Sequence, residues 1–214
     1  EAYREAQDVY KQALDIARQL GERFLIFYLD LAGSVLYRIQ ENFPRAENMI
    51  DAALLTAQSG GSAYEINLGN LARADLLLKT NRVKEANELL AFCYDYFKTH
   101  GHHTEINRSM LLIAFAEIML GEKIEASETL KKISYIIATS DTAIPLILLC
   151  REYEAFLRSV KGNLGRQVKE LLTPLDNFEA RLPGLRRNVR HQASIVPFAP
   201  PKMVIQSFGK TRVR

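Results

Sequence analysis

Apolar side chains recur three and four residues apart through most of the chain, which is the spacing of one face of an α-helix. Glycine or proline interrupts this spacing at intervals, and these residues mark helix ends and starts. Before residue 140 the pattern predicts helices over residues 2–20, 23–40, 44–58, 63–80, 82–99, 104–120 and 122–138. Beyond it we expect a helix over 142–161 and a short one over 166–173, which Pro174 ends.

An alanine returns every 40 residues, at Ala6, Ala46, Ala86 and Ala126. Each is followed four residues later by a large side chain and seven residues later by a second packing residue. Such a period is typical of stacked helical hairpins, in which the small residue lets two helices approach and the larger one fills the space between hairpins. The register is lost after residue 140, where Arg166 and Gln167 occupy the expected alanine position, so we expect the array to end there.

This alanine-centred element resembles the tetratricopeptide repeat, in the longer form found in large bacterial transcriptional regulators of the maltose-activator group. The resemblance implies an all-α fold for residues 1–173, a right-handed superhelix of antiparallel helix pairs with repeats of about 40 residues. The chain departs from the repeat at Ser34, where glycine is favoured, and at Glu117, where an aromatic residue is favoured. The resemblance also implies a concave face lined by the first helix of each pair.

We expect this concave face to bind a protein or peptide partner, or a small effector, because an apolar groove with scattered charges suits such ligands. The residues placed there are Tyr28, Leu31, Val35, Arg38, Leu68, Leu71, Asp75, Leu78, Arg108, Leu111, Phe115 and Ile118. Arg38 and Arg108 are the strongest candidates for specific contacts, because a charge on such a face needs a reason. The alternative is that individual members of this set are core residues between hairpins.

Charge is divided unevenly along the chain, whose net charge is +3. All 25 acidic residues lie before residue 180, whereas residues 180–214 hold only basic ones. Prolines also concentrate after residue 173, so we expect residues 174–202 to form a basic linker, with at most a short helix over 176–191. Its basic residues are candidates for contact with nucleic-acid phosphates, and a solvated arm that docks on the acidic body is the alternative; they are Arg186, Arg187, Arg190 and Lys202.

Apolar and polar residues alternate over 203–214, which predicts strand structure and the start of a following domain. The segment from Val204 to Val213, with Phe208 and Gly209 at its centre, resembles the opening strands of the winged-helix DNA-binding domain of antibiotic-regulatory-type activators. That resemblance implies contact with DNA through an adjoining domain; the alternative is that the segment is an arbitrary strand or a disordered end.

Candidate catalytic chemistry is sparse. His100, His102 and His103 cluster at a helix break without the further ligands that a metal needs, and no phosphate loop or nucleophile motif is present. We therefore expect no enzyme activity, cofactor or metal. No apolar run is long enough to span a membrane and no secretory leader is visible, so we expect a cytoplasmic protein.

Together these features predict a signal-sensing or protein-interaction module of a bacterial transcriptional regulator. It would relay the binding of a ligand or partner to an adjoining DNA-binding domain, through a shift in superhelix curvature or through self-association. The alternative is a general protein–protein interaction scaffold unrelated to transcription.

Overall fold

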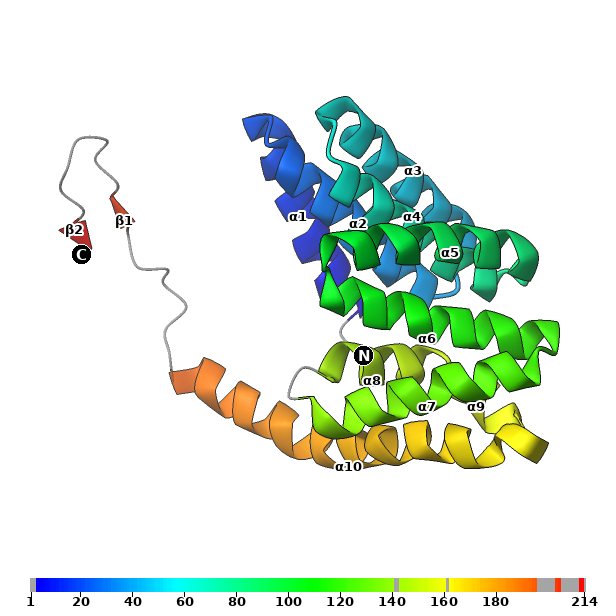
Figure 1. The fold of residues 1–214 in the computed structure, drawn as a ribbon. Helices are drawn as coiled ribbons and strands as arrows, with labels where there is room; N and C mark the ends of the chain where they lie inside the picture. The colour runs from blue at the N-terminus through cyan, green and yellow to red at the C-terminus, as the bar shows by residue number, and fades with distance from the viewer. Residues whose placement is uncertain (1–2, 141–142, 161, 196–202, 205–211, 214) are drawn as a thin grey trace. The chain divides into compact units, whose positions relative to one another are not determined.

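The computed structural model describes residues 3–140, 143–160, 162–195, 203–204 and 212–213 (Figure 1). The chain divides into two compact units, residues 1–174 and 175–214, each of which is described by itself. The regular secondary structure of the described residues is helical apart from one antiparallel pair of two-residue strands, so the expected all-α class is confirmed. In that pair, β1 (Met203–Val204) runs against β2 (Arg212–Val213), with Met203 opposite Val213.

The first helices follow the predicted boundaries to within two residues, because local apolar spacing and the breaking residues determine them. They are α1 (Tyr3–Leu20), α2 (Arg23–Ile39), α3 (Phe43–Gly60), α4 (Ala63–Lys79), α5 (Val83–His100), α6 (His103–Leu120) and α7 (Lys123–Thr139). Gly121 shows why glycine ends such a helix. Its φ of 85° lies in the left-handed region, which a side chain with a Cβ disfavours, and it leaves room for the turn into α7.

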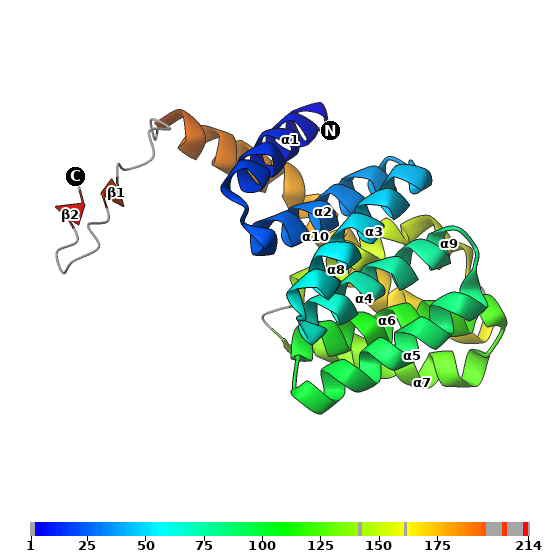
Figure 2. The ribbon, with the colours of Figure 1, turned by 90° about the horizontal axis from the view of Figure 1, so that it is seen from above.

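Consecutive helices pack against one another from α1 to α7 (Figures 1 and 2). The even-numbered helices α2, α4, α6 and α8 (Ile144–Glu152) also contact one another in that order, and we call them the inner layer. Three of the four spaced alanines lie at the helix contacts, since Ala46, Ala86 and Ala126 are completely buried, whereas Ala6 is half-buried. Close helix packing requires a small side chain at the contact, because a larger one would not fit between the two backbones.

Two predictions about the later part of the chain are wrong. The expected helix over 142–161 is interrupted at Tyr153, so that α8 is followed by α9 (Glu154–Ser159) and by a short 3₁₀ turn, η1 (Gly162–Leu164). Neither Pro174 nor Pro183 ends a helix, because α10 runs unbroken from Gly165 to Ile195.

The physical reason for the long α10 is that a proline removes one backbone donor without removing the apolar stripe. The stripe continues at helical spacing across Pro174, from Val168 and Leu171 to Leu175. The predicted linker over 174–202 is therefore helical as far as Ile195, and residues 196–202 lie outside the described part of the chain.

Candidate functional site

A network of charged side chains lies inside the inner layer, centred on Asp75 of α4, which is completely buried. One carboxylate oxygen, Oδ2, accepts hydrogen bonds from Arg38 of α2 and from Arg108 of α6, the latter at 3.4 Å. The other, Oδ1, accepts the hydroxyl of Tyr153 at 2.8 Å. One buried carboxylate thus joins α2, α4, α6 and the junction between α8 and α9.

Arg38 connects this carboxylate to a second one. Its Nη2 lies 2.8 Å from Oε2 of Glu152, the last residue of α8. The Arg38 side chain is only 4% exposed, and its Nε is buried without a hydrogen-bond partner in the described part of the chain. A buried guanidinium with an unused donor carries a desolvation cost that the ion pairs must offset.

The interruption at Tyr153 is explained by what its neighbours contact. Lys79 donates its ammonium to the backbone carbonyl of Glu152, and the same Nζ lies 3.6 Å from the centre of the Tyr153 ring. A side chain that inserts into the backbone ladder is a known cause of helix kinks. The ring also packs against Phe115 of α6, with centroids 4.7 Å apart, so apolar and polar contacts hold Tyr153 at the same point.

Burial and charge shift the ionisation of this network in opposite directions. Burial would raise the pKa of Asp75, but Arg38, Arg108 and the Tyr153 hydroxyl outweigh it and hold that pKa below its ordinary value. Burial raises the pKa of Glu152, although Arg38 opposes the shift. Burial likewise lowers the pKa of Lys79 against the pull of Asp75 and Glu152. The ionised form of Asp75 is therefore favoured in the folded protein, whereas burial disfavours the charged forms of Glu152 and Lys79.

The network opens into a pocket of about 540 Å³, which we call the inner pocket. Its basic residues are Arg38, Lys79 and Arg151, its acidic residues are Glu41, Glu152 and Glu154, and its apolar residues are Val35, Ile39, Phe43 and Leu148. This volume lies within the range of small-molecule sites, roughly 300–1,000 Å³. Charges of both signs beside an apolar wall suit a ligand that itself carries both signs.

The structure brings together three of the twelve residues expected on the concave face, Arg38, Asp75 and Arg108, and Val35 lines the inner pocket. Four others are buried: Leu71, Leu78, Leu111 and Phe115. The remaining four are half-buried: Tyr28, Leu31, Leu68 and Ile118. Of these, Tyr28, Leu31 and Leu68 pack on the core around Phe27, which is the role that the alternative described.

Sequence reasoning missed Lys79, Glu152 and Tyr153. Glu152 and Tyr153 lie after residue 140, where the repeat register is lost, so no spacing pointed to them. A usable signal was the pair of charged residues that follows the apolar run Ile144–Cys150, Arg151 and then Glu152, because a charged residue must find a partner if that end of the helix is buried.

The predicted nucleic-acid contacts lie elsewhere. Arg186 is half-buried and Arg187 is exposed, both on the part of α10 that belongs to the second unit. The Arg190 side chain and the whole of Lys202 lie outside the described residues.

Glu152→Gln should change how stability depends on pH. Since the pKa of Glu152 is raised in the folded protein, the folded state holds the extra proton more tightly. Wild-type stability relative to the variant should then fall as pH rises from the ordinary glutamate pKa, about 4.3, through the raised value. Urea unfolding between pH 4 and 8 measures this difference, with Glu128→Gln, at an exposed position of α7, as the control variant. A difference that grows with pH would contradict the assigned environment.

The described residues offer few groups for other chemistry. They contain no cluster of three histidine, cysteine or acidic side chains able to hold a metal ion, and no helix among them is long and apolar enough to cross a membrane. Burial raises the pKa of Cys93 and of Cys150 to about 12, so neither thiol is an activated nucleophile. Comparison of the chain with protein-family models, with curated proteins and with solved structures finds no match in any of the three.

Proposed function

We propose that this chain is a helical-repeat binding module that receives a small effector, or the end of a partner peptide, in the inner pocket. The observation that carries the proposal is the buried network around Asp75, which ends at the wall of that pocket. Apolar residues of similar volume would join these helices at least as well as buried ion pairs do. Stability alone therefore gives no reason for these charges, and binding in the adjoining pocket supplies one.

The pocket lining indicates the chemistry of the ligand. Lys79 and Arg151 line the pocket with positive charge that suits a carboxylate, and Glu41 adds negative charge that suits an amine, whereas Glu154 already pairs with Arg158. Ile39 and Leu148, which are 41% and 40% exposed, offer an apolar surface beside them. An amino acid with an apolar side chain, or a peptide terminus of the same kind, satisfies all three requirements.

Binding there would be relayed through the network. A ligand group that pairs with Lys79 or Glu152 competes with the contacts those residues make to Tyr153 and Arg38. Because Arg38 belongs to α2 and Glu152 to α8, the competition changes how two distant parts of the inner layer are held together. A ligand shifts such an equilibrium by its difference in affinity for the two arrangements.

The wider setting of this proposal is the tetratricopeptide-like right-handed superhelix of roughly 40-residue repeats in a bacterial transcriptional regulator. The buried alanines at Ala46, Ala86 and Ala126 support the repeat, and the basic residues after 180 support a neighbouring DNA-binding region. A gel-shift titration of the full-length protein with and without effector tests this setting. If the protein does not bind DNA, or if effector does not change its affinity for DNA, the scaffold alternative is favoured.

The pocket itself is tested by thermal shift of the chain against a panel of amino acids and dipeptides, followed by calorimetry of the strongest hit. Lys79→Met should weaken that ligand at least tenfold, because it removes a cation from the pocket wall. Lys84→Met, an exposed lysine on α5, is the matched control and should leave affinity unchanged. Equal effects of the two variants, or no ligand in the panel, would reject the proposal.

A further inference from the structure

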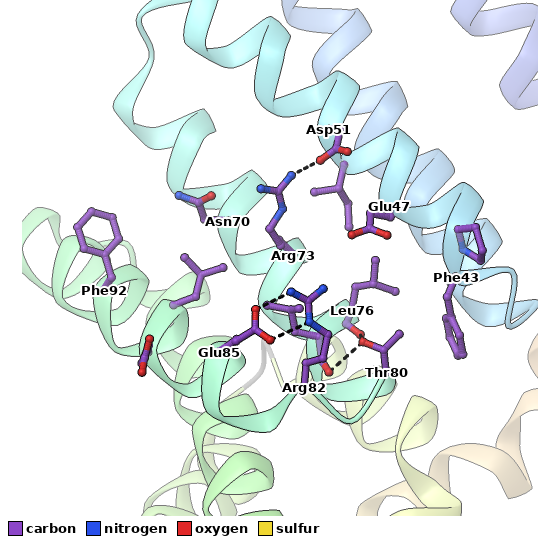
Figure 3. A pocket seen from close by; sticks show the side chains of 15 residues that line it. Phe43, Glu47, Asp51, Asn70, Arg73, Leu76, Thr80, Arg82, Glu85 and Phe92 are labelled. Carbon is purple, nitrogen blue, oxygen red and sulfur yellow. Dashed lines mark hydrogen bonds and ion pairs between the residues drawn. The ribbon is translucent and has the colours of Figure 1, made fainter.

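A second pocket, of about 820 Å³, lies between α3 and α5 with α4 as its base (Figure 3). We call it the α3–α5 pocket. Figure 3 shows Phe43 and Phe92 at opposite ends of it, with Arg73 and Arg82 between them. Ile50, Leu76 and Leu77 form an apolar base that is almost fully buried, whereas Phe92 is 61% exposed. The pocket therefore has a buried apolar base and an exposed aromatic side chain at its edge.

The two arginines of this pocket are already neutralised. Arg73 of α4 pairs with Asp51 of α3, and Arg82 pairs with Glu85 through Nε at 2.8 Å and Nη2 at 2.5 Å. A bidentate pair of this kind fixes the guanidinium in place. Neither arginine is therefore left to attract an anion.

Two further carboxylates line the same pocket, Glu47 on α3 and Glu88 on α5. Both are exposed, and neither forms a hydrogen bond or ion pair within the part of the chain that the structure describes. With the arginines neutralised, these two leave the pocket negatively charged on both walls. Such a field attracts cations from solution, and it weakens as salt is added.

We propose that the α3–α5 pocket docks a basic amphipathic helix of a partner protein. The apolar base takes the partner's leucine-type side chains at helical spacing, Phe92 packs over them, and lysine or arginine residues beside the stripe pair with Glu47 and Glu88. This is the helix-in-groove mode of recognition, in which apolar anchors supply affinity and flanking charges supply selectivity. The pocket is separate from the effector chemistry proposed for the inner pocket, although Phe43 lines both.

The test uses a synthetic probe, a fluorescein-labelled 14-residue leucine/lysine peptide whose leucines share one helical face. Its binding to the full chain is followed by anisotropy at low and at high salt. A peptide with the same leucines and glutamate for lysine, and a scrambled leucine/lysine peptide without a continuous face, are the control probes. We expect the amphipathic basic peptide to bind at least tenfold more tightly than either, and more weakly at high salt.

The variants locate the binding. The double variant E47K/E88K should weaken the probe at least tenfold, and Phe92→Ala should weaken it severalfold. The double variant E125K/E128K, which makes the same charge change at exposed positions of α7, should leave affinity near the wild-type value. Equal weakening by the two double variants would show non-specific attraction and overturn the proposal, as would equal binding of the scrambled peptide. Lys79→Met, in the inner pocket, should not change the affinity for the peptide probe. A failure of the inner-pocket proposal is therefore distinguishable from a failure of this one.

Discussion

Asp75→Ala should lower the free energy of unfolding by about 3–5 kcal/mol, the range found when one member of a buried ion pair is removed. The loss is large because Arg38 stays buried at 4% exposure with only Glu152 to pair with, and the Tyr153 hydroxyl loses its closest acceptor. Chemical denaturation at neutral pH measures it directly.

The matched control for Asp75 is Asp95→Ala, at an exposed position on α5. Its effect should stay within about 0.5 kcal/mol, as is usual for surface substitutions. The double variant R38M/D75L removes both buried charges together and should recover a large part of the loss. A cost below about 1 kcal/mol for Asp75→Ala would show that the network does not hold the inner layer together.

The pH dependence gives Asp75 a separate signature, best read with Asp75→Asn. The pKa of Asp75 is lowered in the folded protein, so its ionised form contributes stability above the ordinary aspartate pKa, about 3.9. That contribution is lost as pH falls through the lowered value. The stability difference between wild type and Asp75→Asn should therefore shrink below about pH 4, opposite in sign to the change expected for Glu152→Gln.

Phe115→Ala should lower the free energy of unfolding by about 3–5 kcal/mol, because it opens a cavity at a completely buried position. Its ring contacts Tyr153 and also Phe156 of α9, with centroids 6.0 Å apart in the second pair. Removing it leaves the α8–α9 junction without its apolar support. Thermal and urea denaturation both report the loss.

Phe92→Ala removes the same side chain from an exposed position and is the control for Phe115. It should change the free energy of unfolding by less than about 0.5 kcal/mol. If the two phenylalanine variants lower the free energy of unfolding equally, the junction between α8 and α9 is not packed as described. Phe92→Ala also serves the peptide experiment, since a stable variant with weaker probe binding reports on the α3–α5 pocket alone.

The helices of the first unit could be predicted from the sequence because local features set them. Apolar spacing placed the faces of α2 to α7, and glycine marked the ends of three of them, α3, α5 and α6. Small side chains at Ala46 and Ala86 indicated where helices approach closely, and both are completely buried. Local signals failed at Pro174, where an apolar stripe that runs on through α10 outweighs one lost backbone donor.

For the candidate site, too, local features were predictable from the sequence and long-range contacts were not. The sequence by itself determined that Arg38 and Arg108 lie on the inner helices, because helical spacing fixes the face of each residue. Only the tertiary structure decided that both arginines would share Asp75 as their partner. It also brought the Tyr153 hydroxyl to the same carboxylate, across 78 residues of chain. The same holds for Glu152 and Lys79, which meet where the helical run breaks. The physical reason is that burial turns charge into a requirement for a partner, and burial is a property of the packed helices, which no local pattern encodes.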